Sequence, residues 1–175
     1  MLRGENLSDL VNRVKDLLDK AEVNAEHLVR TSAMSALNAA QMAAWEANGD
    51  SLQELQWCAT LDPRTCLVCG TMDGDVWPVG EAHATAPLHW NCRCCVVPVP
   101  QLWSKLGLEP PAGVRAAWGG QVSGDTTWES WLKGLPEDQQ KEILGPARQH
   151  LWQSWKITIS DLRWISALSR VRPSV

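Results

Sequence analysis

The spacing of apolar positions predicts that the first part of the chain, from about residue 6 to residue 47, is helical. Its apolar side chains recur at intervals of three and four, and so share one helix face: Leu7, Leu10, Val14, Leu17 and Leu18. Asn6 or Ser8 is suited to cap the start, and Asn48-Gly49 to end the segment. Residues 23–26 contain no Gly or Pro, so the pattern leaves open whether one long helix or two hairpinned helices form.

The middle of the chain has the pattern of short strands and tight turns. Residues 55–61 roughly alternate between apolar and polar side chains, which predicts a strand. Residues 94–99 are a second strand candidate, whose prolines favour either the edge of a sheet or the end of a strand. Asp62-Pro63 and Asp73-Gly74 are typical of turns, and the second turn leads into an apolar segment at 76–78.

The last third again has helical patterns, separated by capping and breaking residues. Thr126 and Glu129 have the spacing of a capping box at the start of a helix. Pro136 suits the first turn of the next helix, and Gly145-Pro146 ends that helix. Ser160-Asp161 is predicted to cap a final helix.

These elements predict an α+β protein that is mostly helical. Four segments are expected: an N-terminal helical arm at 1–54, a Cys/His metal-binding centre with short strands at 55–106, a Pro/Gly-rich loop or linker at 107–124, and a C-terminal segment of short helices at 125–175.

Composition and charge narrow the functional classes. The chain has 175 residues, 45% hydrophobic residues and a formal net charge of −4, which favours a folded core and excludes a uniformly basic nucleic-acid coat. No apolar run is long enough to span a membrane, and the N-terminus lacks the pattern of a secretory signal. The chain has 11 Trp but no Phe or Tyr, so Trp is expected to fill the aromatic core positions.

The residues with the clearest chemical meaning are cysteines and histidines in two pairs. Cys66 and Cys69 form a Cys-x2-Cys motif, and after nineteen residues His89 and Cys92 form a His-x2-Cys motif. Two such pairs suit tetrahedral Zn²⁺. Cys94 is a rival ligand, because a Cys92-x-Cys94 clip would leave His89 outside the ligand set.

The cysteines and histidines allow three alternatives to a structural zinc site: disulfides, free thiols and a catalytic site. Disulfides are disfavoured by the reducing compartment expected for a chain without a secretory signal. Cys58 and Cys95 lie in the strand-like segments and are expected to be buried free thiols. A closed site with four ligands favours a structural over a catalytic metal, and no glutamate is placed as in zinc deaminases. A zinc-stapled HNH-like nuclease remains the alternative, and it would need His89 free as a general base.

An ordered motif surrounds these cysteines and histidines. It consists of Trp57, then Leu61-Asp62-x-Arg64-Thr65-Cys66-x-x-Cys69, then Met72-Asp73-Gly74-x-Val76-Trp77-Pro78, then Pro87-Leu88-His89-x-Asn91-Cys92-Arg93-Cys94. This motif resembles the head morphogenesis domain of tailed phages, the Mu-F-like minor head proteins. The resemblance extends over roughly residues 28–165, with Trp155 standing where the family pattern has Gly.

The resemblance implies a virion component without enzymatic activity. Such a minor capsid protein is made in the host cytoplasm, associates with the portal protein and other head proteins at the portal vertex, and acts in head assembly and DNA packaging or ejection. No small-molecule substrate and no membrane are expected. Arg64 and Arg93 are expected to tie their loops to carboxylates such as Asp62 or Asp73.

The distribution of charge adds one candidate contact. Residues 141–175 hold six basic and two acidic side chains, whereas the rest of the chain is acidic. Such an asymmetry is typical either of a partner-facing tail or of a solvated helix face with a frayed end. Any contact with packaged DNA is expected to be weak and confined to this segment, with Arg163, Arg170 and Arg172 as the candidate residues.

Overall fold

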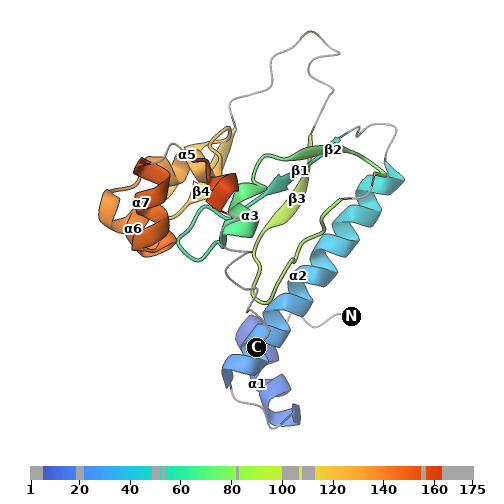
Figure 1. Ribbon diagram of the computed structural model, residues 1–175. Helices are drawn as coiled ribbons and strands as arrows, with labels where there is room; N and C mark the ends of the chain where they lie inside the picture. The colour runs from blue at the N-terminus through green and yellow to red at the C-terminus, as the bar shows by residue number, and fades with distance from the viewer. Residues whose placement is uncertain are drawn as a thin grey trace, which may run out of the picture.

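The computed structural model of the protein is α+β and about half helical, with helices at both ends and a small sheet at the centre (Figure 1). It describes residues 6–18, 22–48, 52, 54–81, 83–99, 107, 113–154 and 157–162. This architecture confirms the predicted fold class.

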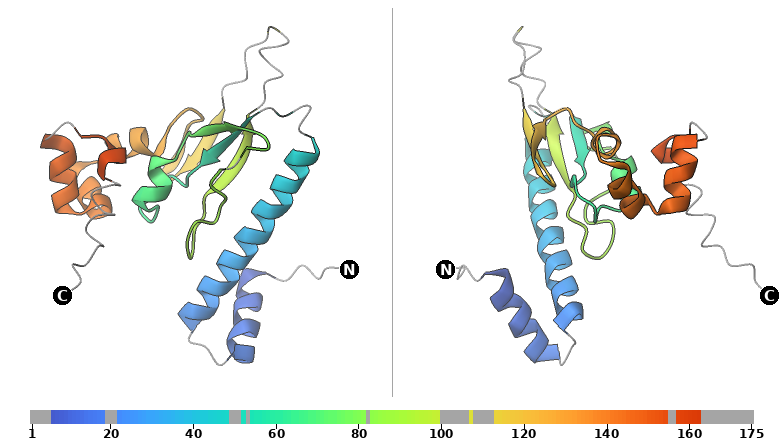
Figure 2. Two further views of the ribbon diagram at one scale, coloured as in Figure 1. Left: turned by 45° about the vertical axis from the view of Figure 1, so that its right-hand side comes forward. Right: turned by 90° about the vertical axis from the view of Figure 1, so that its left-hand side faces the viewer.

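The N-terminal arm is a hairpin of two helices, α1 (Leu7–Leu18) and α2 (Glu22–Ala47). Asn6 caps the first helix, because its Oδ1 accepts a hydrogen bond of 2.9 Å from the backbone N–H of Asp9. Figure 2 shows α1 folded back along the first half of α2, where Val11, Ala25 and Val29 form a small buried cluster. The hairpin gives the apolar face of α1 a partner that a single straight helix would not supply.

The central sheet has the strand order β2-β1-β3, and both pairings are antiparallel. Strand β1 (Glu54–Cys58) lies between β2 (Val76–Pro78) and β3 (Cys95–Val99). The proline-containing strand β3 is therefore at an edge, as predicted. Along β1, Leu55 and Trp57 are fully buried on one face, and Gln56 and Cys58 are partly exposed on the other.

Residues 114–123 form a β-hairpin where the Pro/Gly-rich pattern predicts a loop or linker. Strand β4 (Val114–Ala117) pairs with β5 (Gly120–Ser123) in antiparallel register. The φ angles of Gly119 and Gly120 are +98° and +142°, a region that favours glycine, so these residues make the tight turn between the strands. The backbone N–H of Trp118 donates to the carbonyl of Leu61 at 2.7 Å and anchors the hairpin beside the sheet.

Among the described residues, the hairpin is followed by the helices α5 (Trp128–Lys133), α6 (Glu137–Leu144) and α7 (Pro146–Ser154), and by a short helical segment at 159–162. The predicted cap of α5 is wrong by one residue, because Thr127 rather than Thr126 accepts the N–H of Ser130, at 3.2 Å. The predicted cap at Ser160-Asp161 is also wrong. Thr158 accepts the N–H of Asp161 at 3.2 Å, and the Asp161 carboxylate accepts the N–H of Thr158 at 2.7 Å, which makes a reciprocal capping box for the helical residues 159–162.

One hydrophobic core joins the buried face of the sheet to the C-terminal helices. Its largest fully buried side chains are Trp57 and Trp128, which confirms that Trp fills the aromatic core positions. Trp128 packs so closely on Gly70 that a Cβ atom there would lie 2.4 Å from its ring. Within the described segments, none of the helices combines the length and apolar character that crossing a bilayer requires.

Candidate metal centre

The first pair of candidate ligands lies at the start of the short helix α3 (Leu67–Thr71). Cys66 is the N-cap of this helix, and its Sγ accepts the backbone N–H of Cys69 at 3.5 Å. The Nε1–H of the buried Trp57 donates to the Cys69 carbonyl at 3.1 Å. The helix start and the core Trp therefore hold both sulfur atoms in fixed positions.

The second pair lies on the loop that precedes β3. This loop turns tightly between His89 and Cys92, whose backbone N–H donates to the His89 carbonyl at 3.1 Å. Asn91 has a left-handed backbone with φ of +59°. Its N–H donates to Oγ1 of Thr31 on α2 at 3.0 Å, so the helical arm supports the loop that carries the ligands.

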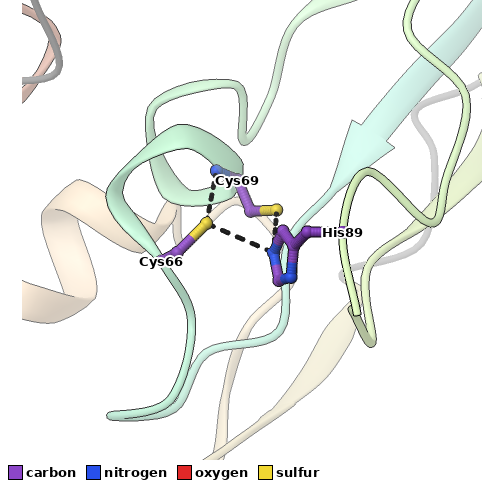
Figure 3. A group of neighbouring side chains, drawn as sticks. All are labelled: Cys66, Cys69 and His89. Atoms are coloured by element: carbon purple, nitrogen blue, oxygen red, sulfur yellow. Dashed lines mark hydrogen bonds between the residues drawn. The ribbon is translucent and has the colours of Figure 1, made fainter. Parts of the chain in front are cut away.

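The two segments bring their sulfur and nitrogen atoms together, as Figure 3 shows for Cys66, Cys69 and His89. Nε2 of His89 lies 3.3 Å from both Cys66 Sγ and Cys69 Sγ, and Cys69 Sγ lies 3.8 Å from Cys92 Sγ. A tetrahedral zinc site requires about 3.8 Å between two sulfur atoms and about 3.5 Å between sulfur and nitrogen. The spacing of these atoms therefore fits a tetrahedral metal.

Five donors rather than four gather at the centre. They form two groups, Cys66 with Cys69 and His89, and Cys69 with Cys92 and Cys94, and within each group all donor atoms lie within 4.8 Å of one another. Cys69 belongs to both groups. These Cys/His groups have the composition and spacing to hold a metal ion. Neither Cys92 nor Cys94 lies within 4.8 Å of all three donors of the first group, so the predicted set of four meets only through Cys69.

The His89 ring is oriented by its own backbone. Its Nδ1 lies 2.8 Å from the carbonyl oxygen of Trp90, which accepts the Nδ1–H. This tautomer leaves the Nε2 lone pair facing the sulfur atoms of Cys66 and Cys69, as a histidine ligand requires. Burial opposes the charged ring, but this hydrogen bond and the nearby Cys66 raise the pKa of His89.

The cysteines of the centre differ in the direction in which their pKa values are shifted. Hydrogen bonding from Cys69 is the main cause that lowers the pKa of Cys66 to about 5, and hydrogen bonds from Cys69 and Cys94 lower the pKa of Cys92 to about 2. The same contacts raise the pKa of Cys69. The lowered pKa values of Cys66 and Cys92 favour the thiolate, the form in which cysteine binds metal.

An ion pair ties the two ligand-bearing segments together. The Arg93 guanidinium makes two hydrogen bonds to the Asp62 carboxylate, one of them Nη2 to Oδ1 at 2.8 Å. Burial opposes ionisation of Asp62, but the hydrogen bonds from Arg93 lower the pKa of its carboxyl group. The predicted tie between Arg93 and Asp62 is present. Arg64 contacts Asp62 through its backbone N–H, at 2.9 Å.

Asp73 has a partner that the sequence pattern did not reveal. Its side chain is 1% exposed and accepts two hydrogen bonds of 2.9 Å from Arg115 on β4. It also accepts the backbone N–H groups of Ala59 at 2.7 Å and Trp128 at 2.6 Å. Asp73 therefore connects β1, the β4–β5 hairpin and the start of α5. The adjacent Gly74 makes the predicted turn with φ of +93°.

The remaining candidate residues lie elsewhere. Cys58 and Cys95 are free thiols but are half-exposed, so the prediction that they are buried is wrong. They lie on the face of the sheet opposite Trp57. Trp155 and the proposed DNA contacts Arg163, Arg170 and Arg172 lie outside the described residues.

Comparison of the sequence with known families gives a match. The family model described as Phage Mu protein F like protein matches residues 1–97, a span that includes the arm, α3 and all five candidate ligands. The chain belongs to this family. Neither a curated protein nor a solved structure matches the chain significantly. Membership in the Mu F-like family makes the chain a phage head morphogenesis protein, a virion component that interacts with other head proteins.

Proposed function

We propose that this Mu F-like chain is a minor capsid protein that acts at the portal vertex, in head assembly and in DNA packaging or ejection, without enzymatic activity. The observation that carries the proposal is the family match over the arm and the Cys/His centre together. The ligand loop bonds to the arm through Asn91 and Thr31, and Cys69, Cys92 and Cys94 belong to the core shared by the sheet and the C-terminal helices. These contacts support a structural role for the centre.

The proposed cofactor is one structural Zn²⁺, held by Cys66, Cys69, His89 and Cys92, with Cys94 as the rival fourth ligand. The spacing of the donor atoms and the thiolate character of Cys66 and Cys92 support this ion. The metal supplies a crosslink between α3 and the loop before β3. A structural zinc contributes about 10 kcal/mol or more to the fold that forms its site.

The contacts of both ring nitrogen atoms of His89 argue against the nuclease alternative. A general base needs a free ring nitrogen that faces the substrate. Here Nδ1–H is committed to the Trp90 carbonyl, and Nε2 faces two cysteine sulfur atoms. The proposed role of His89 is therefore that of a ligand.

The face beside the ligand loop is the proposed contact with a head partner such as the portal protein. A cavity of about 370 Å³ lies between the arm and this loop, and its lining includes Arg30, Met34, Arg64 and Trp90. Trp90 is 63% exposed. Exposed tryptophan and arginine side chains are the residue types most enriched at protein interfaces.

Reconstruction of particles without imposed icosahedral symmetry should place the chain at the portal vertex, in few copies relative to the major capsid protein. Trp90→Ala should reduce its incorporation, because Trp90 lines the cavity of the proposed contact and exposes its aromatic side chain. The matched control is Trp118→Ala, which removes an exposed tryptophan from the β4–β5 turn, outside the lining of this cavity. Hundreds of copies over the whole shell would mean a decoration protein instead.

The purified chain should not cut duplex DNA in the presence of Mg²⁺ or Mn²⁺, and His89→Ala should lower its melting temperature. Any DNA binding should be weak and should fade as the salt rises, because each neutralised phosphate contributes about 0.9 to the salt slope. Substituting Arg163, Arg170 and Arg172 should remove that binding. Metal-dependent cleavage that disappears in a folded His89→Ala variant would establish the nuclease.

A further inference from the structure

Two cysteines outside the metal centre lie side by side on neighbouring strands, on the same face of the sheet. Cys58 at the end of β1 and Cys95 at the start of β3 are directly opposite in the antiparallel register. Side chains alternate between the two faces of a strand, so Cys95 lies on the opposite face from its buried neighbour Cys94. The sheet therefore separates this thiol pair from the five candidate metal ligands.

The backbone geometry of this pair suits a disulfide. Directly opposite residues of an antiparallel sheet have Cα atoms about 4.5 or 5.5 Å apart, according to their place in the ladder. Both distances lie within the range of about 4.4 to 6.8 Å that disulfides span. Both thiols are free and stand at directly opposed positions of the ladder, so the backbone is already in the range that a disulfide needs.

The surroundings of Cys58 favour its reaction. Nη2 of Arg115 lies 3.4 Å from Cys58 Sγ. Hydrogen bonding from Cys95 is the main cause that lowers the pKa of Cys58 to about 7; burial and Asp73 oppose this, and the Arg115 charge adds to it. Cys58 also lines a cavity of about 330 Å³ between the sheet and the β4–β5 hairpin, which gives a small reagent access to its sulfur atom.

We propose that Cys58 and Cys95 are a redox-active pair, oxidised to an intrachain disulfide by exchange with a small disulfide such as oxidised glutathione. The Cys58 thiolate attacks one glutathione sulfur atom, and the other glutathione leaves as a thiolate. The Cys95 sulfur atom then attacks Cys58 in the mixed disulfide, and the second glutathione leaves with the Cys95 proton. The protein pair loses two electrons, and oxidised glutathione gains them.

The move of a virion from the reducing cytoplasm to an oxidising medium would drive oxidation of this pair. A virion protein is made in a reducing cytoplasm and is later released into an oxidising medium. The pair stays reduced while the head assembles, and its oxidation after release joins the central strand β1 covalently to the edge strand β3. This role rests on the assignment to the phage head, whereas the reaction rests on the strand register and on the surroundings of Cys58.

The test incubates the full reduced chain with oxidised glutathione at pH 7, blocks the remaining thiols, maps the peptides by mass spectrometry and measures zinc in the same sample. A Cys58–Cys95 linked peptide with unchanged metal content is expected. The Cys95→Ser variant should stop at a stable glutathione adduct on Cys58, because the resolving thiol is missing.

Two results would overturn the proposal. One is that Cys58 and Cys95 remain separately alkylated after full oxidation. The other is that disulfides form only among the cysteines of the metal centre, with loss of metal. A metal-free chain that still forms the Cys58–Cys95 disulfide would support this proposal and contradict the zinc proposal, so the two are tested independently.

Discussion

Replacing Cys69 with serine should abolish metal binding and remove most of the stability of the central fold. Cys69 belongs to both groups of candidate ligands, and its sulfur atom lies 3.3 Å from His89 Nε2 and 3.8 Å from Cys92 Sγ. Loss of a structural zinc costs about 10 kcal/mol, which is comparable to the whole stability of a typical domain, about 5–15 kcal/mol. Thermal unfolding and metal content of the purified variant measure both effects.

Matched cysteine variants make this test specific. Cys58→Ser changes a half-exposed thiol outside the centre and should keep the wild-type metal content. Cys92→Ser and Cys94→Ser identify the fourth ligand, because only the variant that removes a ligand should lose the metal. Cys69→Ser protein with wild-type metal content and melting temperature would contradict a role for this residue as a ligand.

The second large effect is expected for Asp73→Ala, which should destabilise the fold by about 3–5 kcal/mol, the usual cost of removing one partner from a buried ion pair. The substitution leaves the half-buried Arg115 without its carboxylate and leaves the N–H groups of Ala59 and Trp128 without their acceptor. Chemical denaturation at neutral pH measures the loss of unfolding free energy.

Two controls separate the buried ion pair from general surface effects. Glu129→Gln breaks the exposed pair between Glu129 and Lys133 on α5 and should cost less than about 0.5 kcal/mol. The double variant Asp73→Ala with Arg115→Met should lose less than the sum of the two single variants, because no unpaired charge then remains. Full additivity, or an Asp73→Ala variant as stable as Glu129→Gln, would contradict the role of Asp73.

The features that could be predicted from the sequence depend mostly on the spacing of residues a few positions apart. The Cys-x2-Cys and His-x2-Cys pairs fix the distance between donors over a few residues, and the two pairs lie together in the structure. Strands β1 and β3 follow from alternation and proline placement. The sequence could also have shown that Cys95 faces away from its neighbour Cys94, because adjacent residues of a strand lie on opposite faces. The pairing of Cys95 with Cys58 comes from the register of the strands.

Contacts between distant segments account for what the sequence pattern missed. The β4–β5 hairpin has the Gly-rich composition of a linker, and its place is set by pairing with residue 61 and by the ion pair of Arg115 with Asp73. Asp73 accepts the N–H of Trp128, in the turn where Thr127 caps the helix. Thr31 supports the ligand loop across sixty residues of sequence. No local pattern contains these pairings.

The most direct test of the account is the metal content of the chain purified without chelator, measured by elemental analysis and native mass spectrometry. The account predicts one equivalent of zinc per chain, and a lower melting temperature once a strong chelator has removed it. A well-folded wild-type chain without metal, whose melting temperature does not change in chelator, would contradict it.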